Sequence, residues 1–290
     1  MQRIAALLAP RRASSGGSGS GSPPVPGIAA RNDPRTANDR PILVVTPTFD
    51  RPGRMAFLER CLATFRRIAG LHWIVVEDGA LCSPAVAELL AASSVSHVYL
   101  AHGPTRAWGN AQRDLALRHI RDGGMQGVVY LADDDNYYQE PLFAELRKLR
   151  RVGVVPVGLL GPSGIERPIL RAGRIVDWSA HWKSRRYPLD MAGFAFDAAL
   201  LQAMSGPIWT YSARGGETEF LERLIASPDE LEILCNGCRD CFVWHDLPLD
   251  RSPASALAAY RLRRCANFLI GRVARPLLAG RRSGKTPGPQ

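Results

Sequence analysis

The sequence has no apolar run long enough to cross a membrane. The longest run, from Val152 to Gly161, is about half of the roughly 20 residues that a transmembrane helix needs. Cysteine is sparse, with six in 290 residues, which excludes a small disulfide-stabilised scaffold. The Asn-x-Ser/Thr signal for N-glycosylation is absent, so this modification gives no information on the compartment. A composition of 46% hydrophobic and 22% charged residues excludes a fully disordered or collagen-like chain and indicates a globular protein.

Acidic residues are scarce at both ends of the chain. The formal net charge is +10, to which residues 1–40 contribute +4 and residues 251–290 contribute +9, leaving −3 for the region between them. Because the basic excess belongs to the ends, the sequence gives little support for a nucleic-acid groove in the central region. Basic ends suit peripheral contact with an anionic membrane surface, or simple solvation, equally well.

Composition divides the chain into segments. Residues 1–40 are rich in Gly, Ser and Pro and are predicted to form a disordered leader, with an organelle transit peptide as the alternative. Residues 41–150 alternate short apolar strands with amphipathic helices, whereas residues 151–250 mix short strands, turns and helices. Residues 251–290 are predicted to be a basic helix and tail, which either lies on a membrane surface or packs on the protein.

The alternating region predicts an α/β fold with a parallel-rich central sheet and helices on both faces. Its predicted strands are 42–45, 72–76, 95–100 and 127–131, and its predicted helices are 55–68, 83–92, 106–121 and 141–149. Later strands are predicted at 169–172, 174–178 and 241–243, with helices near 197–204 and 217–226. Ligands of such sheets bind beyond the carboxyl ends of the strands, so polar residues at those ends are the candidates for function.

Three adjacent carboxylates, Asp133, Asp134 and Asp135, follow the strand that ends at Leu131. Their charges repel one another, so a fold keeps them together only if something offsets the charge. A divalent cation such as Mg²⁺ or Mn²⁺ does so, because it prefers oxygen ligands and commonly takes carboxylates together with substrate phosphates. The sequence therefore predicts a cation and diphosphate site here, with a solvated acidic turn as the structural alternative.

Other strand ends carry polar or aromatic residues that suit a nucleotide. Glu77 and Asp78 follow the second strand, where an acid can accept hydrogen bonds from a ribose or a base, and Phe49 follows the first, where its ring can stack on a base. His245 follows a later strand that could border the same crevice. Each of these residues taken singly is more often a capping or packing residue, but together they favour a nucleotide site.

The C-terminal half holds two further groups of interest. Glu217 opens a predicted helix after a glycine-rich loop, where plain helix capping is the alternative to catalysis. Cys235, Cys238 and Cys241 have the spacing of metal ligands but lack a fourth ligand of the usual pattern, so a disulfide within the cluster or free thiols are favoured over zinc.

These segments resemble glycosyltransferase family 43, the β-1,3-glucuronyltransferases of animals and their xylan-synthesis relatives in plants. The resemblance covers about residues 41–246 and rests on six segments that occur in family order: Val44 to Phe49, Trp73 to Asp78, Gln112-Arg113, Val129 to Asn136, Asp190 to Ala195 and Val243 to His245. It implies a GT-A fold, with a nucleotide-binding half over residues 41–150 and an acceptor-binding half over residues 151–250 of one catalytic domain.

The resemblance also implies a UDP-sugar donor, a Mn²⁺ cofactor and inversion at the anomeric carbon. By position, Asp135 corresponds to the direct metal ligand, and Asp133 and Asp134 to neighbours that contact ribose and donor sugar. The remaining donor-side positions are Phe49 against the uracil, Asp78 at the base, Arg113 on the donor and His245 near the diphosphate and donor sugar.

On the acceptor side, the resemblance places Glu217 as the general base, with Glu219 as the rival because loop lengths differ by a residue. The positions that correspond to acceptor-sugar contacts are Glu166, Trp182, Arg185 and Asp190. Two donor positions depart from the family: Trp108 stands where members usually have Arg, and Leu247 stands where animal members have a phosphate-binding Arg.

The predicted function is therefore Mn²⁺-dependent, inverting transfer of a sugar, with glucuronic acid favoured, from a UDP-sugar to a hydroxyl of a glycan acceptor. The alternatives are a xylan-type xylosyltransferase that uses UDP-xylose, and a non-catalytic scaffold member of a polysaccharide-synthesis complex. The expected compartment is the Golgi if the source is eukaryotic, and otherwise the cytoplasm or a membrane periphery. A homodimer is a further expectation, and no nucleic-acid partner is expected.

Overall fold

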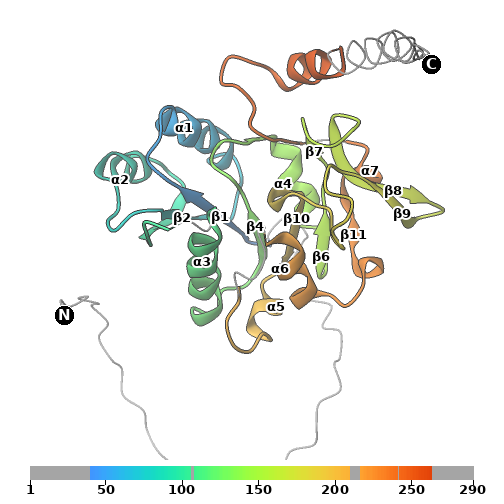
Figure 1. Ribbon diagram of the computed structural model, residues 1–290. Coiled ribbons are helices and arrows are strands. Elements are labelled where there is room, and N and C mark those ends of the chain that lie inside the picture. The colour runs from blue at the N-terminus through green and yellow to red at the C-terminus, as the bar shows by residue number, and fades with distance from the viewer. Residues whose placement is uncertain (1–39, 106–107, 210–215, 241, 263–290) are drawn as a thin grey trace, which may run out of the picture. The chain divides into compact units, whose positions relative to one another are not determined.

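The computed structural model describes residues 40–105, 108–209, 216–240 and 242–262, and Figure 1 shows their arrangement. A seven-stranded sheet forms the centre, with the strand order β11-β6-β10-β4-β1-β2-β3. Its strands are β1 (Ile42–Thr48), β2 (Leu71–Glu77), β3 (Ser96–Ala101), β4 (Val128–Leu131), β6 (Val152–Val154), β10 (Phe194–Asp197) and β11 (Glu232–Ile233).

The first four strands of this sheet are parallel. β1 pairs with both β2 and β4, and β2 pairs with β3, all in parallel register. β10 then enters antiparallel between β4 and β6. Because β1, β2 and β4 run parallel, their carboxyl ends meet at one edge of the sheet, which is where the candidate site lies.

Two apolar cores cover the two faces of the sheet. Side chains of a strand point alternately to opposite faces, and accordingly Ile42 and Val44 belong to one core whereas Leu43 and Val45 belong to the other. Both faces are buried, so β1 and β4 read as continuous apolar runs rather than as alternating patterns. The first core packs on α1 (Arg54–Phe65), α2 (Pro84–Ala91) and α4 (Glu140–Leu146), and the second on α3 (Asn110–Asp122), α5 (Ala199–Gln202) and α6 (Glu217–Leu224).

A second sheet of five strands, in the order β5-β12-β7-β8-β9, forms the wall on the acceptor side. Its strands are β5 (Tyr137–Tyr138), β7 (Val157–Gly158), β8 (Ile165–Arg171), β9 (Arg174–Ser179) and β12 (Val243–Trp244). Residues 253–262 are helical and pack against it: Ala256 is buried, and the Tyr260 hydroxyl donates to the Gly161 carbonyl at 2.8 Å.

The α/β architecture predicted from the sequence is confirmed, and three details differ. α3 begins at Asn110 rather than near residue 106, because Trp108 and Gly109 adopt left-handed backbone conformations that cannot continue a helix. The strands expected at 169–172 and 174–178 are one hairpin that starts earlier, at Ile165. α6 ends at Leu224, because Ile225 is extended.

The expected halves of the catalytic domain share one sheet, since β6, β10 and β11 from residues 151–250 extend the sheet built by residues 41–150. The predicted leader, Cys241 and the end of the predicted C-terminal helix lie outside the described residues, except that residue 40 is described. Cys235 and Cys238 are buried in a turn, labelled α7 (Leu234–Cys238), that contains left-handed residues. Among the helices described, none is long and apolar enough to span a bilayer.

Candidate active site

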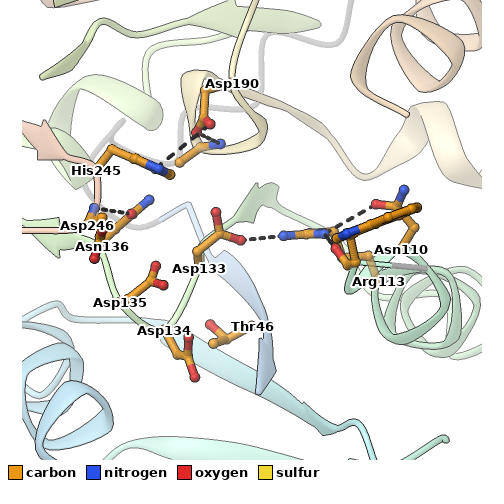
Figure 2. A network of polar contacts seen from close by, with 12 residues as sticks. Thr46, Asn110, Arg113, Asp133, Asp134, Asp135, Asn136, Asp190, His245 and Asp246 are labelled. Carbon is orange, nitrogen blue, oxygen red and sulfur yellow. Dashed lines mark hydrogen bonds and ion pairs between the residues drawn. The ribbon is translucent and has the colours of Figure 1, made fainter. Parts of the chain in front are cut away.

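The acidic turn lies directly beyond β4, at the edge where β1 and β2 also end (Figure 2). The Thr48 hydroxyl at the end of β1 donates to Asp134 at 2.7 Å. Arg51, three residues later, pairs with Asp134 and, at 3.0 Å, with Asp135. Burial raises the pKa of Asp134 to about 6, and the Thr48 hydrogen bond and the Arg51 charge oppose this rise. The chain itself therefore supplies part of the positive charge that the carboxylates need.

Asp133 has its own cationic partner, Arg113 of α3 (Figure 2). Arg113 also donates to the Trp108 carbonyl at 3.1 Å and to the Asn110 side chain at 3.2 Å. Gly109, directly before the helix, has φ +81 in the left-handed region, and a Cβ there would lie 2.9 Å from Arg113 Nη1. Only glycine therefore lets the guanidinium pass close to the backbone and reach Asp133.

A cavity of about 390 Å³ opens above these groups, and we call it the donor cavity. The residues that line it are Pro47, Thr48, Phe49, Arg51, Asp78, Trp108, Gly109, Gln112, Arg113, Asp133, Asp134, Asp135 and His245. They come from the ends of β1 and β2, the start of α3 and the turns after β4 and β12.

Aromatic and acidic groups at one end of the donor cavity suit a base. The Phe49 ring is 47% exposed, and the Arg51 guanidinium lies 4.9 Å from its centroid. Asp78 accepts a hydrogen bond from the Thr105 backbone amide at 2.7 Å, which fixes its carboxylate at the cavity wall. Glu77, by contrast, is buried and bonded to Arg54 at 2.7 Å, so its role is structural.

A second cavity of about 210 Å³ adjoins the first, and we call it the acceptor cavity. Its lining residues are Leu160, Glu166, His181, Trp182, Arg185, Pro188, Leu189, Asp190, Glu217 and His245. His245 lines both cavities, so the two adjoin at this residue. Trp182 is 64% exposed and presents an indole face, the kind of surface on which sugar rings pack.

Glu217 is the first residue of α6, and its side chain is 13% exposed. Gly216 before it has φ +86, and a Cβ there would lie 2.5 Å from Trp209 Nε1, so glycine is required for the helix to start here. Arg185 donates to the Glu217 carboxylate at 3.0 Å. Burial raises the pKa of Glu217, and Arg185 partly opposes the rise. Glu219 is not among the described residues that line the acceptor cavity.

Two further carboxylates face Glu217 across the acceptor cavity. Glu166 is buried and accepts a hydrogen bond from the Asp190 backbone amide at 2.5 Å, and burial together with the Asp190 charge raises the pKa of Glu166 to about 8. Burial also raises the pKa of Asp190, which the His245 charge opposes. Glu166 is therefore largely protonated near neutral pH and can donate a hydrogen bond to an acceptor hydroxyl.

Two groupings of side chains offer oxygen or nitrogen ligands to a metal ion. Asp135, with a side chain 24% exposed, faces the donor cavity. Separately, Asp133, Asp190 and His245 each place one ligand atom within 4.8 Å of the others (Figure 2). The carboxylate oxygens of the acidic turn, next to a cavity large enough for a diphosphate, fit a hard divalent cation such as Mg²⁺ or Mn²⁺.

All twelve candidate residues from the sequence line one of the two cavities. Arg51 and Arg60, which no motif of the sequence singles out, contact the acidic turn from the loop before α1 and from α1 itself. The sequence signal for them is that three adjacent carboxylates need positive charge, which a metal ion can also supply. Leu247, one of the two departures from the family, is buried rather than directed into the donor cavity.

Comparison with known proteins places this arrangement in a family. The family model described as glycosyltransferase family 43 matches residues 61–247. The galactosylgalactosylxylosylprotein 3-beta-glucuronosyltransferase 2 of Rattus norvegicus is 39% identical over 223 residues, covering 70% of this chain and 68% of the relative. The enzyme of the same name from Canis lupus familiaris is 38% identical over 269 residues, covering 84% and 79%.

Among solved structures, the inositol-1-phosphate CTP transferase from T. maritima superposes with a TM-score of 0.53 at 9% identity, over 77% of this chain and 96% of that one, which shows a shared fold alone. The mostly parallel sheet with one antiparallel strand confirms the GT-A architecture. The family model matches most of the catalytic region, and the two relatives are this similar over more than two thirds of their length. The chain therefore belongs to glycosyltransferase family 43 and is a glycosyltransferase.

Proposed function

We propose that the protein transfers glucuronic acid from UDP-glucuronate to a hydroxyl of a glycan acceptor, with inversion at the anomeric carbon. The observation that carries the proposal is the pair of adjoining cavities that meet at His245, one with the acidic turn and the other with Glu217. The relatives at 38–39% identity are named 3-beta-glucuronosyltransferases, which supports this donor sugar.

In the donor cavity, Phe49 and Asp78 bind the uracil and Arg113 binds the donor. Asp133 and Asp134 contact the sugar and the ribose, and their pairs with Arg113 and Arg51 hold them in place. Asp135 would hold the divalent cation, Mn²⁺ in this proposal. When bound, the cation would supply Lewis-acid stabilisation of the negative charge that develops on the UDP leaving group.

In the acceptor cavity, Glu217 takes the proton from the attacking hydroxyl. Glu217 belongs to the acceptor cavity and not to the donor cavity, which supports attack from the side opposite UDP and hence inversion. Trp182, Arg185, Asp190 and Glu166 hold the acceptor sugar, which lowers the entropic cost of bringing two sugars together.

Two alternative functions make different predictions. A UDP-xylose-dependent xylosyltransferase would use the same two cavities with a donor that lacks the carboxylate, and Trp108 at the donor cavity, where the family usually has Arg, is the feature that favours it. A non-catalytic scaffold would not need the partly buried Glu217–Arg185 pair or the paired aspartates. The homodimer, the peripheral membrane contact and the Golgi compartment stay predictions.

A donor screen tests the proposed function. UDP release is measured with Mn²⁺ and a panel of UDP-glucuronate, UDP-xylose, UDP-galactose and UDP-glucose, each with and without a galactose-terminated acceptor. We expect acceptor-dependent release from UDP-glucuronate. If UDP were released only from UDP-xylose, the xylosyltransferase function would replace this proposal. If a folded protein that binds UDP released none from any donor, the scaffold function would be favoured.

A further inference from the structure

Arg60, on α1, joins two turns that are far apart in the sequence. Its Nη2 donates to the Asp135 carbonyl and its Nη1 to the Leu247 carbonyl, both at 2.5 Å. Asp135 lies 75 residues and Leu247 lies 187 residues from Arg60 along the chain. One guanidinium therefore cross-links the acidic turn after β4 with the turn after β12.

Both turns carry groups of the candidate site. The first holds the three aspartates, and the second holds His245, which lines both cavities. The strands beside these turns give little support of their own, because β5 and β12 pair over only two residue pairs, Val243↔Tyr138 and Trp244↔Tyr137. Other bonds between these segments run from the Asp246 amide to the Asn136 side chain at 3.1 Å (Figure 2) and from Trp244 Nε1 to the Gln139 side chain at 3.2 Å.

Arg60 approaches the turns from outside the donor cavity. It does not line that cavity but a separate surface cavity of about 650 Å³, together with Thr64, Arg67 and Tyr137. The Phe57 ring lies 5.2 Å from its guanidinium carbon and supports it from the side. Arg60 Nε is buried, and within the described residues it has no hydrogen-bond partner. Both of its terminal nitrogens are thus committed to the two backbone carbonyls.

We propose that Arg60 is a positioning residue: it sets the acidic turn and His245 at a fixed separation, and so fixes the geometry in which the donor cavity receives a nucleotide diphosphate and its cation. It touches neither substrate. Hydrogen bonds from a charged donor are the stronger ones in proteins, and an unpaired carbonyl left behind in each turn adds to the loss. The role in donor binding rests on the proposed function, whereas the cross-link between the turns does not.

The test compares Arg60→Met and Arg60→Lys with the control Arg67→Met. Met retains the apolar stem of Arg60 and removes both donors, and Lys retains a cation that can serve one carbonyl. Arg67 lies in the turn two residues beyond the end of α1, is 61% exposed and pairs with Glu140, so its replacement removes a similar charge without touching either turn. Hydrogen exchange is followed in peptides spanning residues 133–139 and 243–248, in protein without ligand.

We expect exchange in both peptides to rise at least tenfold in Arg60→Met, to an intermediate degree in Arg60→Lys and not in Arg67→Met. Calorimetry with UDP and Mn²⁺ is expected to show an affinity about tenfold lower for Arg60→Met, the change that one such hydrogen bond brings. Unchanged protection in both turns would overturn the proposal, and so would faster exchange spread evenly over the central sheet with a lower melting temperature. If even the unaltered protein failed to bind UDP, the proposed function would fall, while exchange would still decide whether Arg60 joins the turns.

Discussion

Replacing Glu217 with Gln separates catalysis from binding at this site. Gln has the same size, and its carbonyl oxygen can still accept the hydrogen bond from Arg185, but it cannot take a proton from the acceptor hydroxyl. Loss of a general base lowers turnover by two to four orders of magnitude, or about 3 to 5 kcal/mol of barrier. The Arg185 side chain is 28% exposed, so water can replace the lost ionic partner, and the cost in folding free energy stays below about 1 kcal/mol.

The assay measures UDP release at saturating donor and acceptor, together with calorimetric binding of UDP. Glu217 does not line the donor cavity, so UDP affinity is expected to stay within a factor of about two to three, which is under about 1 kcal/mol. Glu219→Gln is the matched control, because Glu219 is in the same first turn of α6. The assignment of the base is refuted if Glu219→Gln loses turnover and Glu217→Gln does not, or if Glu217→Gln loses UDP binding as well.

Four other predictions follow from the same geometry. Asp135→Ala should abolish Mn²⁺-dependent UDP binding with the melting temperature nearly unchanged, and Mn²⁺-dependent binding at the original affinity would contradict the ligand assignment. Turnover should fall as the pH drops through a value above the 4.5 of an ordinary Glu, because burial raises the pKa of Glu217 and only the ionised base accepts a proton; a pH profile whose acid limb lies below 4.5 would contradict it. Glu166→Gln should raise the melting temperature more at pH 8 than at pH 5, because the folded state holds this carboxyl protonated up to about pH 8 while the unfolded chain ionises it near 4.5, and an equal effect at both pH values would disprove the cause. Tyr260→Phe should lower stability by about 1 kcal/mol through loss of its bond to the Gly161 carbonyl, as measured by urea unfolding, and an unchanged unfolding midpoint would contradict this role of the hydroxyl.

The sequence predicts the first half of the fold well, because its signals there are local. β1 and β2 end in the polar residues Thr48 and Glu77, and the acidic turn begins two residues after β4. A helix of regular periodicity follows β1 and β2, so both the strands and the edge that holds the candidate site could be located. In the second half, β10 is antiparallel, and β11 and β12 are each two residues long. Strands this short owe their conformation to their neighbours rather than to their own composition.

The residues of the site also divide into those that local sequence signals indicate and those that only tertiary contacts reveal. The aspartates, Asp78 and Glu217 stand at ends of elements, where residue type and position already indicate a role. Arg51 and Arg60 do not, because an Arg on an amphipathic helix or in a loop looks solvent-exposed in the sequence, and only the tertiary structure shows that each meets the acidic turn. The start of α3 differs from the prediction for a related reason: Trp108 has a left-handed backbone, and its carbonyl accepts a hydrogen bond from Arg113, and no local pattern in the sequence indicates either feature.

His245 lines both the donor cavity and the acceptor cavity. A ligand that displaces its imidazole ring in one cavity changes the volume left in the other, and thermodynamic linkage requires the effect on binding to be reciprocal. UDP and the glycan acceptor should therefore change each other's affinity even when no transfer occurs. The factor by which UDP changes the affinity for the acceptor must equal the factor by which the acceptor changes the affinity for UDP. His245→Ala should bring that factor toward one.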